Sequence, residues 1–316
     1  MRILVTGARG FAGRHLLSDL SAAGHTPLGF DLQPLPQTLQ VESFPGDLRN
    51  PEDIAKAVRD GRPDACIHLG GIAFVPMGWT HPDLVLSVNL GGTINILETL
   101  RQQAPATRLL VVTSAEVYGH AEQGSAIDED AEMHPSTIYA VAKLAADLTA
   151  LLYARKHGMP VMTARPGNHM GPGQATPFVT ASFAQQLAEM RAGRQPAVLR
   201  VGNLDSERDF TDVRDTVRAY RLLIERGVPG RAYNIATSAR VRIGGMLNQL
   251  CARSGVNPRI EVDPARFRPT DRPTLLDTGR IRADTGWTPE IPLSRTLADI
   301  MEDWNARVLR DQQTSQ

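Results

Sequence analysis

The segment TGARGFAG, residues 6–13, determines how the rest of the chain is interpreted. It follows a short apolar run that predicts a strand, and it precedes a helical pattern over residues 11–23. Its glycines are spaced three apart, at Gly7, Gly10 and Gly13. Such glycines let the chain turn tightly and bring backbone N–H groups and a helix N-terminus against a pyrophosphate. A glycine turn before an ordinary helix is the alternative, but the position between strand and helix favours a dinucleotide-binding turn.

Strand and helix patterns alternate along the first half of the chain. Short apolar runs predict strands at residues 2–6, 26–30, 65–69, 109–113 and 161–164. Helical periodicity predicts helices over residues 11–23, 51–59, 82–102 and 136–156. Strands that alternate with helices form a parallel sheet covered on both faces. We therefore expect an α/β protein with a Rossmann-type, doubly wound parallel sheet.

The pattern changes after about residue 165, where the segments become shorter and glycine, proline and arginine become more frequent. We expect residues 1–165 to form an NAD(P)-binding Rossmann domain. Residues 166–316 are expected to form mainly a smaller C-terminal α/β domain that binds the substrate, with some segments returning to the core.

Composition excludes several classes of partner. The 34 basic and 34 acidic residues give a formal net charge of zero, so nothing global attracts nucleic acid or an anionic membrane. No apolar run reaches the ~18 residues of a membrane span, and the first residues enter a strand pattern without room for a signal peptide. With only Cys66 and Cys251, the chain fits a reducing, cytoplasmic setting. The histidines, including His169, lack the neighbouring ligands of a metal site.

A carboxylate follows the second predicted strand. Asp31 stands 18 residues after Gly13, near where an acid grips the adenosine ribose diol. A carboxylate there repels a 2′-phosphate, so Asp31 favours NAD(H), while NADP(H) remains possible. A solvated acid at a strand end is the alternative. Asp47 and Leu48 are further candidates, for the adenine edge.

A tyrosine and a lysine lie four residues apart in YAVAK, residues 139–143. On a helix, Tyr139 and Lys143 share one face. A nearby ammonium favours the phenolate, so we expect the pKa of Tyr139 to be lowered. The phenol can then exchange a proton with a hydroxyl or ketone while hydride moves. An incidental surface pair is the alternative.

The strand upstream of this helix carries further polar groups. Ser114 lies near the carboxyl edge of the sheet, where open α/β folds bind ligands, and its hydroxyl can reach the same reacting oxygen as Tyr139. Glu116 is a candidate general base, a contact to a substrate hydroxyl, or a helix-end charge.

Together these residues resemble the extended short-chain dehydrogenase/reductase family, and the resemblance covers essentially the whole chain. It implies binding of NAD(P), activity on a nucleotide sugar, and a homodimer built by packing helices 82–102 and 136–156 into a four-helix bundle. The catalytic residues it implies are Ser114, Glu116, Tyr139 and Lys143. The cofactor contacts it implies are Gly7, Gly10, Phe11, Ala12, Gly13, Asp31, Asp47, Leu48, Leu69, Gly70, Tyr139, Lys143 and Arg165.

The stretch RPGNHMGPGQ, residues 165–174, is rich in glycine, proline and polar side chains. A surface linker is one interpretation. In the resembled family, however, the chain crosses here above the nicotinamide toward the substrate domain. Asn168 is then expected to face the sugar nucleotide, with Gly171 and Gly173 permitting close backbone approach.

Arginines later in the chain are candidates for the diphosphate. Arg208 and Arg268 are expected to act as clamps, because the planar guanidinium suits phosphate oxygens. Val179 is a further expected substrate contact. The remaining arginines and aspartates of residues 201–220 are expected to form a solvated, salt-bridged helix.

Four stretches narrow the resemblance to the GDP-sugar branch of the family, and within it to its reductases. They are N-H-x-G-P-G-Q, G-N-L-x-x-x-R-D-F-T-D-V-R-D, F-R-P-T-D and T-G-W-x-P-E-I-P-L. This implies hydride transfer to C4 of GDP-4-keto-6-deoxy-D-mannose and protonation of O4 by Tyr139, giving GDP-D-rhamnose. A GDP-mannose 4,6-dehydratase or a 4-epimerase on the same scaffold is the alternative, and a non-catalytic dinucleotide-binding module is a third hypothesis.

One position departs from the resembled pattern. The family has an aromatic residue where this chain has Gly167. Loss of the ring is expected to widen the sugar pocket, so the identity of the sugar is less constrained than the reaction type.

Overall fold

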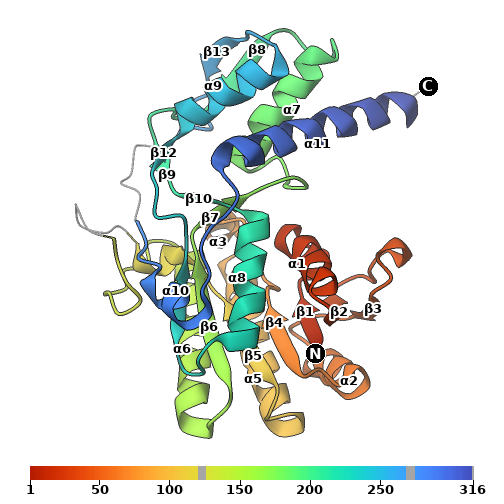
Figure 1. The fold of residues 1–316 in the computed structure, drawn as a ribbon, viewed down its shortest axis with the longest axis vertical. Helices are drawn as coiled ribbons and strands as arrows, with labels where there is room; N and C mark the ends of the chain where they lie inside the picture. The colour runs from red at the N-terminus through yellow and green to blue at the C-terminus, as the bar shows by residue number, and fades with distance from the viewer. Residues whose placement is uncertain (120–125, 268–274, 315–316) are drawn as a thin grey trace.

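The computed structural model describes residues 1–119, 126–267 and 275–314. Its centre is a seven-stranded sheet in the order β11-β6-β5-β4-β1-β2-β3, with every neighbouring pair parallel (Figure 1). The strands are β1 (Arg2–Thr6), β2 (Thr26–Asp31), β3 (Glu42–Pro45), β4 (Ala65–His68), β5 (Arg108–Val112), β6 (Val161–Pro166) and β11 (Ala232–Ile235). The predicted doubly wound α/β fold is confirmed.

Both faces of the sheet are buried, which explains the continuous apolar runs of its strands. Ile3 and Val5 point into one core and Leu4 into the other. One face is covered by α1 (Phe11–Ala22), α8 (Val213–Arg226) and α10 (Gly279–Thr285). The other is covered by α2 (Pro51–Gly61), α5 (Gly92–Gln103) and α6 (Ile138–His157).

A smaller lobe stands above the sheet in Figure 1 and has its own apolar core. Its helices are α7 (Val179–Arg191), α9 (Ile243–Ser254) and α11 (Leu293–Thr314). A parallel pair, β8 (Val198–Val201) and β13 (Arg259–Val262), lies beside them. Residues after 166 therefore contribute to both lobes, since α8, β11 and α10 belong to the sheet domain.

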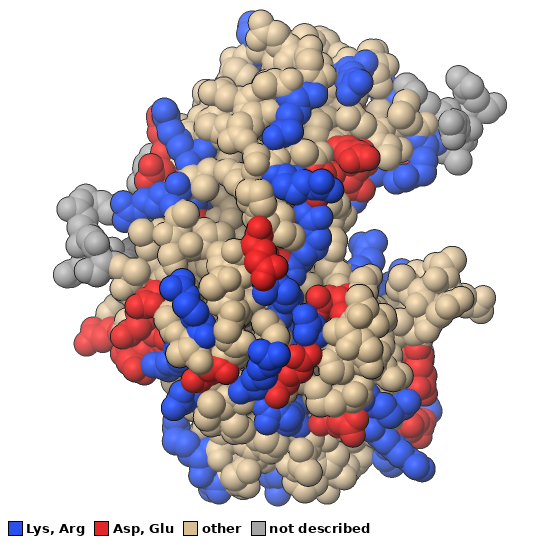
Figure 2. All heavy atoms as spheres, viewed as in Figure 1, with Lys and Arg blue, Asp and Glu red and all other residues tan. Residues whose placement is uncertain are grey.

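Short pairings join the two lobes. The strand β7 (Asn168–Met170) runs parallel to β10 (Phe210–Asp212), and β9 (Glu207–Arg208) runs antiparallel to β12 (Val241–Arg242). Figure 2 shows the surface hollowed between the two lobes on its right side. The described part of the chain also contains the short helical turns η1 (Gln37–Leu39), α3 (Met77–Thr80) and η3 (Ala115–Tyr118).

The single long helix predicted over residues 82–102 is wrong in one respect. The structure has α4 (Pro82–Leu86), a π-helical turn η2 (Ser87–Gly91), and then α5. A π turn inserts one extra residue and rotates the helix beyond it, and such turns are frequent at functional sites. Here the turn contains Asn89, whose side chain is buried.

None of the helices in the described part of the chain combines the length and apolar composition that a membrane span requires.

Candidate active site

The glycine turn sits where β1 ends and α1 begins. Gly7 has φ of +69°, a conformation that favours glycine, and a Cβ there would lie 2.9 Å from the Gly70 backbone. A Cβ on Gly13 would lie 2.2 Å from the Gly7 carbonyl oxygen, so no larger residue fits. The first turn of α1 has neither a side-chain cap nor an acidic residue. This cradle fits an anionic group such as a pyrophosphate.

Asp31 lies beside this turn, at the end of β2. Its Oδ2 accepts a hydrogen bond from the Arg9 amide at 2.9 Å, and its Oδ1 accepts one from the Leu32 amide at 2.9 Å. The carboxylate is therefore held in place against the turn. The guanidinium of Arg9 donates to the Pro34 carbonyl and so lies over the loop that follows Asp31.

Asp47 and Leu48 differ in what they offer a ligand. Asp47 forms an ion pair with Arg49, and this pairing holds the pKa of the Asp47 carboxyl below its usual value. Leu48 is buried beneath the β4 loop, and a Cβ on Gly70 would lie 2.6 Å from its Cδ1. Leu48 thus forms part of the floor on which that loop rests.

Ser114, Tyr139 and Lys143 converge at the carboxyl edge of the sheet, each at most 9% exposed. Thr137 caps α6 by accepting a hydrogen bond from the Ala140 amide at 3.1 Å, so the helix begins just before Tyr139. Ser114 lies two residues beyond the end of β5, with its hydroxyl beside the Tyr139 phenol. Lys143 donates from Nζ to the Val112 carbonyl at 2.9 Å. The structure therefore brings together the three residues that were predicted to act together.

The expected direction of the Tyr139 pKa is wrong. Burial raises the pKa of Tyr139 to about 12; the hydrogen bond with Ser114 opposes this rise and the nearby Glu116 adds to it. Burial also lowers the pKa of Lys143 to about 8. Desolvation of both groups therefore dominates over attraction between them. At neutral pH the phenol is protonated, which is the form that donates a proton.

Glu116 is exposed at the mouth of this group of residues. Its amide donates to Ser114 Oγ at 3.2 Å, as the second residue of the turn η3 that Ser114 caps. Its carboxylate is close enough to Tyr139 to disfavour the phenolate. This position, exposed and next to Ser114 and Tyr139, is compatible with each of the three predicted roles of Glu116.

Two further polar residues at this edge were missed by the sequence reasoning. Asn89 in the π turn accepts a hydrogen bond from the Ile72 amide at 2.7 Å and donates to the Ile72 carbonyl at 3.1 Å. A Cβ on Gly71 would lie 2.8 Å from Asn89 Oδ1 and 3.6 Å from Lys143 Nζ, so the two side chains border the same space. The sequence signal that could have identified Asn89 is the motif VNLGG, residues 88–92, in which an asparagine and two glycines interrupt a predicted helix.

His68, the second missed residue, lies in a buried chain of hydrogen bonds. The Gly70 amide donates to Thr6 Oγ1 at 3.0 Å, and Thr93 Oγ1 donates to the Asn89 carbonyl at 2.7 Å. His68 bridges the two hydroxyls, with Nδ1 2.7 Å from Thr6 Oγ1 and Nε2 3.1 Å from Thr93 Oγ1. Because the Thr93 hydroxyl already donates its proton to the Asn89 carbonyl, His68 must donate from Nε2 to Thr93 Oγ1 and accept at Nδ1 from the Thr6 hydroxyl. The Nε2–H tautomer therefore satisfies every group in the chain of hydrogen bonds. Burial lowers the His68 pKa to about 3, so the ring is neutral.

The crossing segment 165–174 is held from two sides. The His169 ring stacks on Phe11 of α1 with centroids 6.0 Å apart. His15, also on α1, lies with Nε2 2.8 Å from the Pro172 carbonyl oxygen, and the Gly173 amide donates to Asp303 of α11 at 2.9 Å. These contacts exclude a loose surface linker.

Asn168 and Gly167 lie at the start of this segment. Asn168 is exposed on β7, opposite Phe210. The Gly167 amide donates to the Ile235 carbonyl at 2.9 Å, and a Cβ there would find no atom closer than 3.7 Å. Neither the backbone nor crowding requires glycine at this position, because a Cβ there would make only ordinary van der Waals contacts.

The predicted substrate residues of the smaller lobe are placed only in part. Val179 is half-buried and begins α7, and Arg208 is half-buried on β9 and donates to the Glu207 carbonyl at 2.6 Å. Arg268 lies outside the described residues.

The arginines of α8 form the expected ion pairs, but the prediction that the aspartates are solvated is wrong, because Asp212 and Asp215 are buried. Basic and acidic atoms lie side by side over this helix in Figure 2. The pairs are Arg214 with Asp212 and Asp299, Arg218 with Asp215 and Glu290, and Arg221 with Asp19 and Glu225.

The side chain of Arg165 was predicted to contact the cofactor, but the structure places it inside the protein. It is 1% exposed, and its guanidinium donates to Asp147 Oδ2 at 2.6 Å and to the Tyr118 hydroxyl at 2.9 Å. These internal partners occupy the guanidinium, so its role is within the protein.

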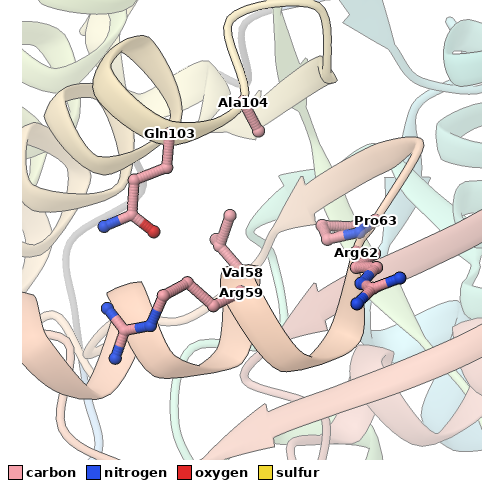
Figure 3. A pocket seen from close by; sticks show the side chains of 6 residues that line it. All are labelled: Val58, Arg59, Arg62, Pro63, Gln103 and Ala104. Carbon is pink, nitrogen blue, oxygen red and sulfur yellow. The ribbon is translucent and has the colours of Figure 1, made fainter.

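A cavity of about 300 Å³ lies away from this site (Figure 3). It is lined by Val58, Arg59, Arg62, Pro63, Gln103 and Ala104. These residues stand where α2 and α5 end and before β4 begins, which is the amino-terminal edge of the sheet. The cavity is therefore separate from the catalytic edge.

Comparison with known proteins agrees with this geometry. Residues 4–300 match the family described as GDP-mannose 4,6 dehydratase. The GDP-6-deoxy-D-mannose reductase of Pseudomonas aeruginosa is 38% identical over 97% of this chain and 98% of its own. A GDP-mannose 4,6-dehydratase of Vibrio cholerae is 25% identical over 96% of this chain and 93% of its own.

Solved structures show the same similarity. The structure of RMD from Pseudomonas aeruginosa complexed with NADPH has a TM-score of 0.87 and 35% identity, and covers 97% of this chain and 99% of its own. The Thermus thermophilus UDP-glucose 4-epimerase complex with NAD has a TM-score of 0.85 and 28% identity, and covers 96% and 99%. The family predicted from the glycine turn and YAVAK is thereby confirmed.

Proposed function

The chain belongs to the GDP-mannose 4,6-dehydratase family, and we propose that within it the protein is an NAD(P)H-dependent reductase. Its proposed substrate is GDP-4-keto-6-deoxy-D-mannose, and its product is GDP-D-rhamnose. The similarity to the Pseudomonas aeruginosa reductase over nearly the full length of both chains supports this choice. The single observation that carries the chemistry is the buried, protonated Tyr139 phenol beside Ser114.

In this proposal, each residue of the catalytic edge has one task. When bound, the reduced nicotinamide supplies the hydride that adds to C4. Ser114 donates a hydrogen bond to the ketone oxygen as negative charge develops on it. Tyr139 transfers its phenol proton to that oxygen, which completes the hydroxyl, and the positive charge of Lys143 stabilises the tyrosinate that remains. Gly7, Gly10 and Gly13, with Phe11 and Ala12 beside them, would hold the pyrophosphate.

We propose that the substrate is held by residues that follow β6. Asn168 faces the sugar, and the lack of a side chain at the neighbouring Gly167 gives the sugar ring room. Arg208 and Arg268 clamp the diphosphate, and Val179 borders the nucleotide.

The division of labour between the two parts of the chain is also proposed. Residues 1–165 serve mainly the cofactor and residues 166–316 mainly the substrate. Cys66 and Cys251 are free thiols, which suits a reducing compartment, so we propose that the reaction takes place in the cytoplasm.

A spectrophotometric assay tests the proposed reaction. The purified protein is mixed with GDP-4-keto-6-deoxy-D-mannose and either NADH or NADPH, and the loss of reduced-nicotinamide absorbance is followed. Rapid loss with a GDP-6-deoxyhexose product is expected. No loss, together with elimination of water from GDP-mannose without added cofactor, would instead assign the dehydratase reaction that the Vibrio cholerae relative is named for. Epimerisation of an added GDP-sugar without net oxidation would assign a 4-epimerase.

For the cofactor, we propose that both NADH and NADPH are used and that Asp31 favours NADH. Its carboxylate is fixed by two backbone amides where a ribose diol would lie. Arg9, whose guanidinium lies over the same loop, offers a positive charge to a 2′-phosphate. The NADPH bound in the Pseudomonas aeruginosa structure is consistent with such dual use.

Asp31→Asn is expected to shift the preference toward NADPH. The amide keeps the side-chain shape but removes the charge that repels a 2′-phosphate. We expect the ratio of kcat/KM for NADPH to that for NADH to rise about tenfold, or ~1.4 kcal/mol. Steady-state kinetics with each cofactor measure the ratio. An unchanged or lower ratio would show that Asp31 does not read the 2′-position.

For the assembly, we propose a homodimer through α4, α5 and α6. Val141, Leu148 and Leu152 of α6 are 42%, 50% and 48% exposed and share one face at helical spacing. Leu86 and Ile94 add apolar surface on α4 and α5, which pack beside α6. A second copy of the same helices would bury both faces in a four-helix bundle.

Leu148→Glu is expected to give a monomer, because it places a charge at the centre of this apolar face. Sedimentation velocity measures the change. Leu309→Glu, at a similarly exposed position on α11 (57% against 50%), is the matched control and should leave the dimer intact. A wild-type monomer, or a dimeric Leu148 variant, would contradict the proposal.

A further inference from the structure

Three consecutive residues at the end of β5 contact three residues of α6 that lie one turn apart. Tyr139, Lys143 and Asp147 are spaced four apart and so form one stripe along the helix. Lys143 Nζ donates to the Val112 carbonyl at 2.9 Å, and the Tyr139 phenol lies beside the Ser114 hydroxyl.

Thr113, between these two, faces Asp147. Its hydroxyl lies 3.1 Å from Asp147 Oδ1 and 3.0 Å from the Ala164 carbonyl oxygen, so its single proton is shared between them. The Thr113 amide donates to the same carbonyl at 2.8 Å. The strand end is thus tied both to α6 and to β6.

Arg165 of β6 fixes the other side of Asp147. Its Nε lies 3.2 Å from Asp147 Oδ1 and its Nη2 2.6 Å from Oδ2, which is a two-point contact with defined geometry. Asp147 is 0% and Arg165 1% exposed. Neither side chain can reach a ligand, so any influence on the reaction is exerted through other residues.

The remaining donors of Arg165 hold the turn that comes after Ser114. Its Nη1 donates to the Tyr118 hydroxyl at 2.9 Å and to the Glu129 carbonyl at 2.8 Å. Tyr118, the last residue of η3, donates to Asn234 Oδ1 on β11 at 2.7 Å. The same guanidinium is therefore linked to the chain on both sides of Ser114, to Thr113 through Asp147 and to Tyr118 directly.

We propose that Asp147 and Arg165 are positioning residues for the reduction. They fix the rotation of α6 against the end of β5, so that the Ser114 hydroxyl and the Tyr139 phenol meet at one substrate oxygen. Small displacements of such groups are costly for catalysis, because the reacting atoms must stay within bonding reach. This inference rests on the proposed function of Ser114 and Tyr139.

Thr113→Val and Arg165→Lys test the inference. Thr113→Val removes one hydroxyl at nearly constant volume, and Arg165→Lys keeps the charge but loses the two-point contact. We expect each to lower kcat about tenfold or more per folded molecule, with unchanged affinity for NADPH. The kinetic isotope effect on kcat with 4-deuterated NADPH should rise, because a misaligned chemical step becomes slower than the other steps. A purely structural role would change neither quantity once the folded fraction is measured.

Arg218→Lys is the matched control, since Arg218 forms an Arg–Asp pair with Asp215 on α8, outside the site. It should leave kcat and the isotope effect at their wild-type values. If Arg165→Lys fails to fold, Thr113→Val and Tyr118→Phe carry the test. Folded variants with wild-type kcat and isotope effect would overturn the inference. If Tyr139→Phe is also fully active, the proposed role of Tyr139 as proton donor fails, and this outcome is distinguished from failure of the positioning role by the activity of Tyr139→Phe itself.

Discussion

Tyr139→Phe is expected to lower kcat for reduction by about 10³-fold while the protein still binds NADPH. The variant loses only the phenol hydroxyl, and positioned proton transfer contributes about 10²–10⁴-fold to such reactions. The ring remains, so packing at this 8%-exposed position is conserved. Single-turnover kinetics with the keto sugar measure the loss, and fluorescence titration measures cofactor binding.

Tyr233→Phe is the control for this variant. Tyr233 is fully buried, and its hydroxyl donates to Asp284 at 2.7 Å, away from the catalytic edge. Its loss should leave kcat near the wild-type value. Full activity of Tyr139→Phe would contradict the role of Tyr139 as the proton donor, whereas a wild-type protein that binds NADPH but turns over no GDP-sugar would support a non-catalytic dinucleotide-binding module.

Lys143→Met is expected to abolish most of the activity and to stabilise the fold. Burial lowers the pKa of Lys143 from 10.5 to about 8, so the native state binds this proton less tightly than the unfolded state. At pH 7 this costs roughly 3 kcal/mol, and methionine removes that cost while it leaves the Val112 carbonyl without its donor. We expect a net gain of about 2 kcal/mol in the free energy of unfolding.

The free energy of unfolding should also depend on pH, in the direction that the lowered pKa of Lys143 predicts. Between pH 8 and 10.5 the unfolded state holds the proton that the native state has lost, so the contribution of Lys143 to stability rises with pH. The advantage of the methionine variant should therefore be largest below pH 8 and should vanish toward pH 10.5. Urea unfolding of both proteins across this range measures the difference. A variant less stable than wild type at pH 7 would contradict the account. Wild-type activity should also fall above about pH 8, as Lys143 loses its charge.

The fold could be predicted because its signals are local. TGARGFAG joins a strand to a helix within one short segment, and the alternation of apolar runs with helical periods needs no knowledge of distant contacts. The convergence of Ser114 with Tyr139 was also accessible, because Ser114 follows a strand end and Tyr139 lies in the first turn of the α-helix that comes next, at the same edge of the sheet.

The remaining features depend on partners that are distant in sequence. Arg165 was expected at the cofactor, but its direction is set by Asp147 on another element and by Tyr118 after β5. The Tyr139 pKa was expected to fall, but burial by the whole fold outweighs the neighbouring lysine. The π turn at Asn89 was not predicted, because one inserted residue hardly changes the apolar periodicity of a helix.

The most direct test of the central claim is the transfer of deuterium from 4-deuterated NADPH, of the stereochemistry that the enzyme uses, to the sugar. The account predicts a GDP-6-deoxyhexose that carries deuterium at C4, with one NADP⁺ formed for each product molecule. NMR of the product also assigns the configuration at C4, which distinguishes the rhamnose from the talose form. A product without deuterium, or turnover of a GDP-sugar with no net consumption of NADPH, would contradict the assignment as a reductase.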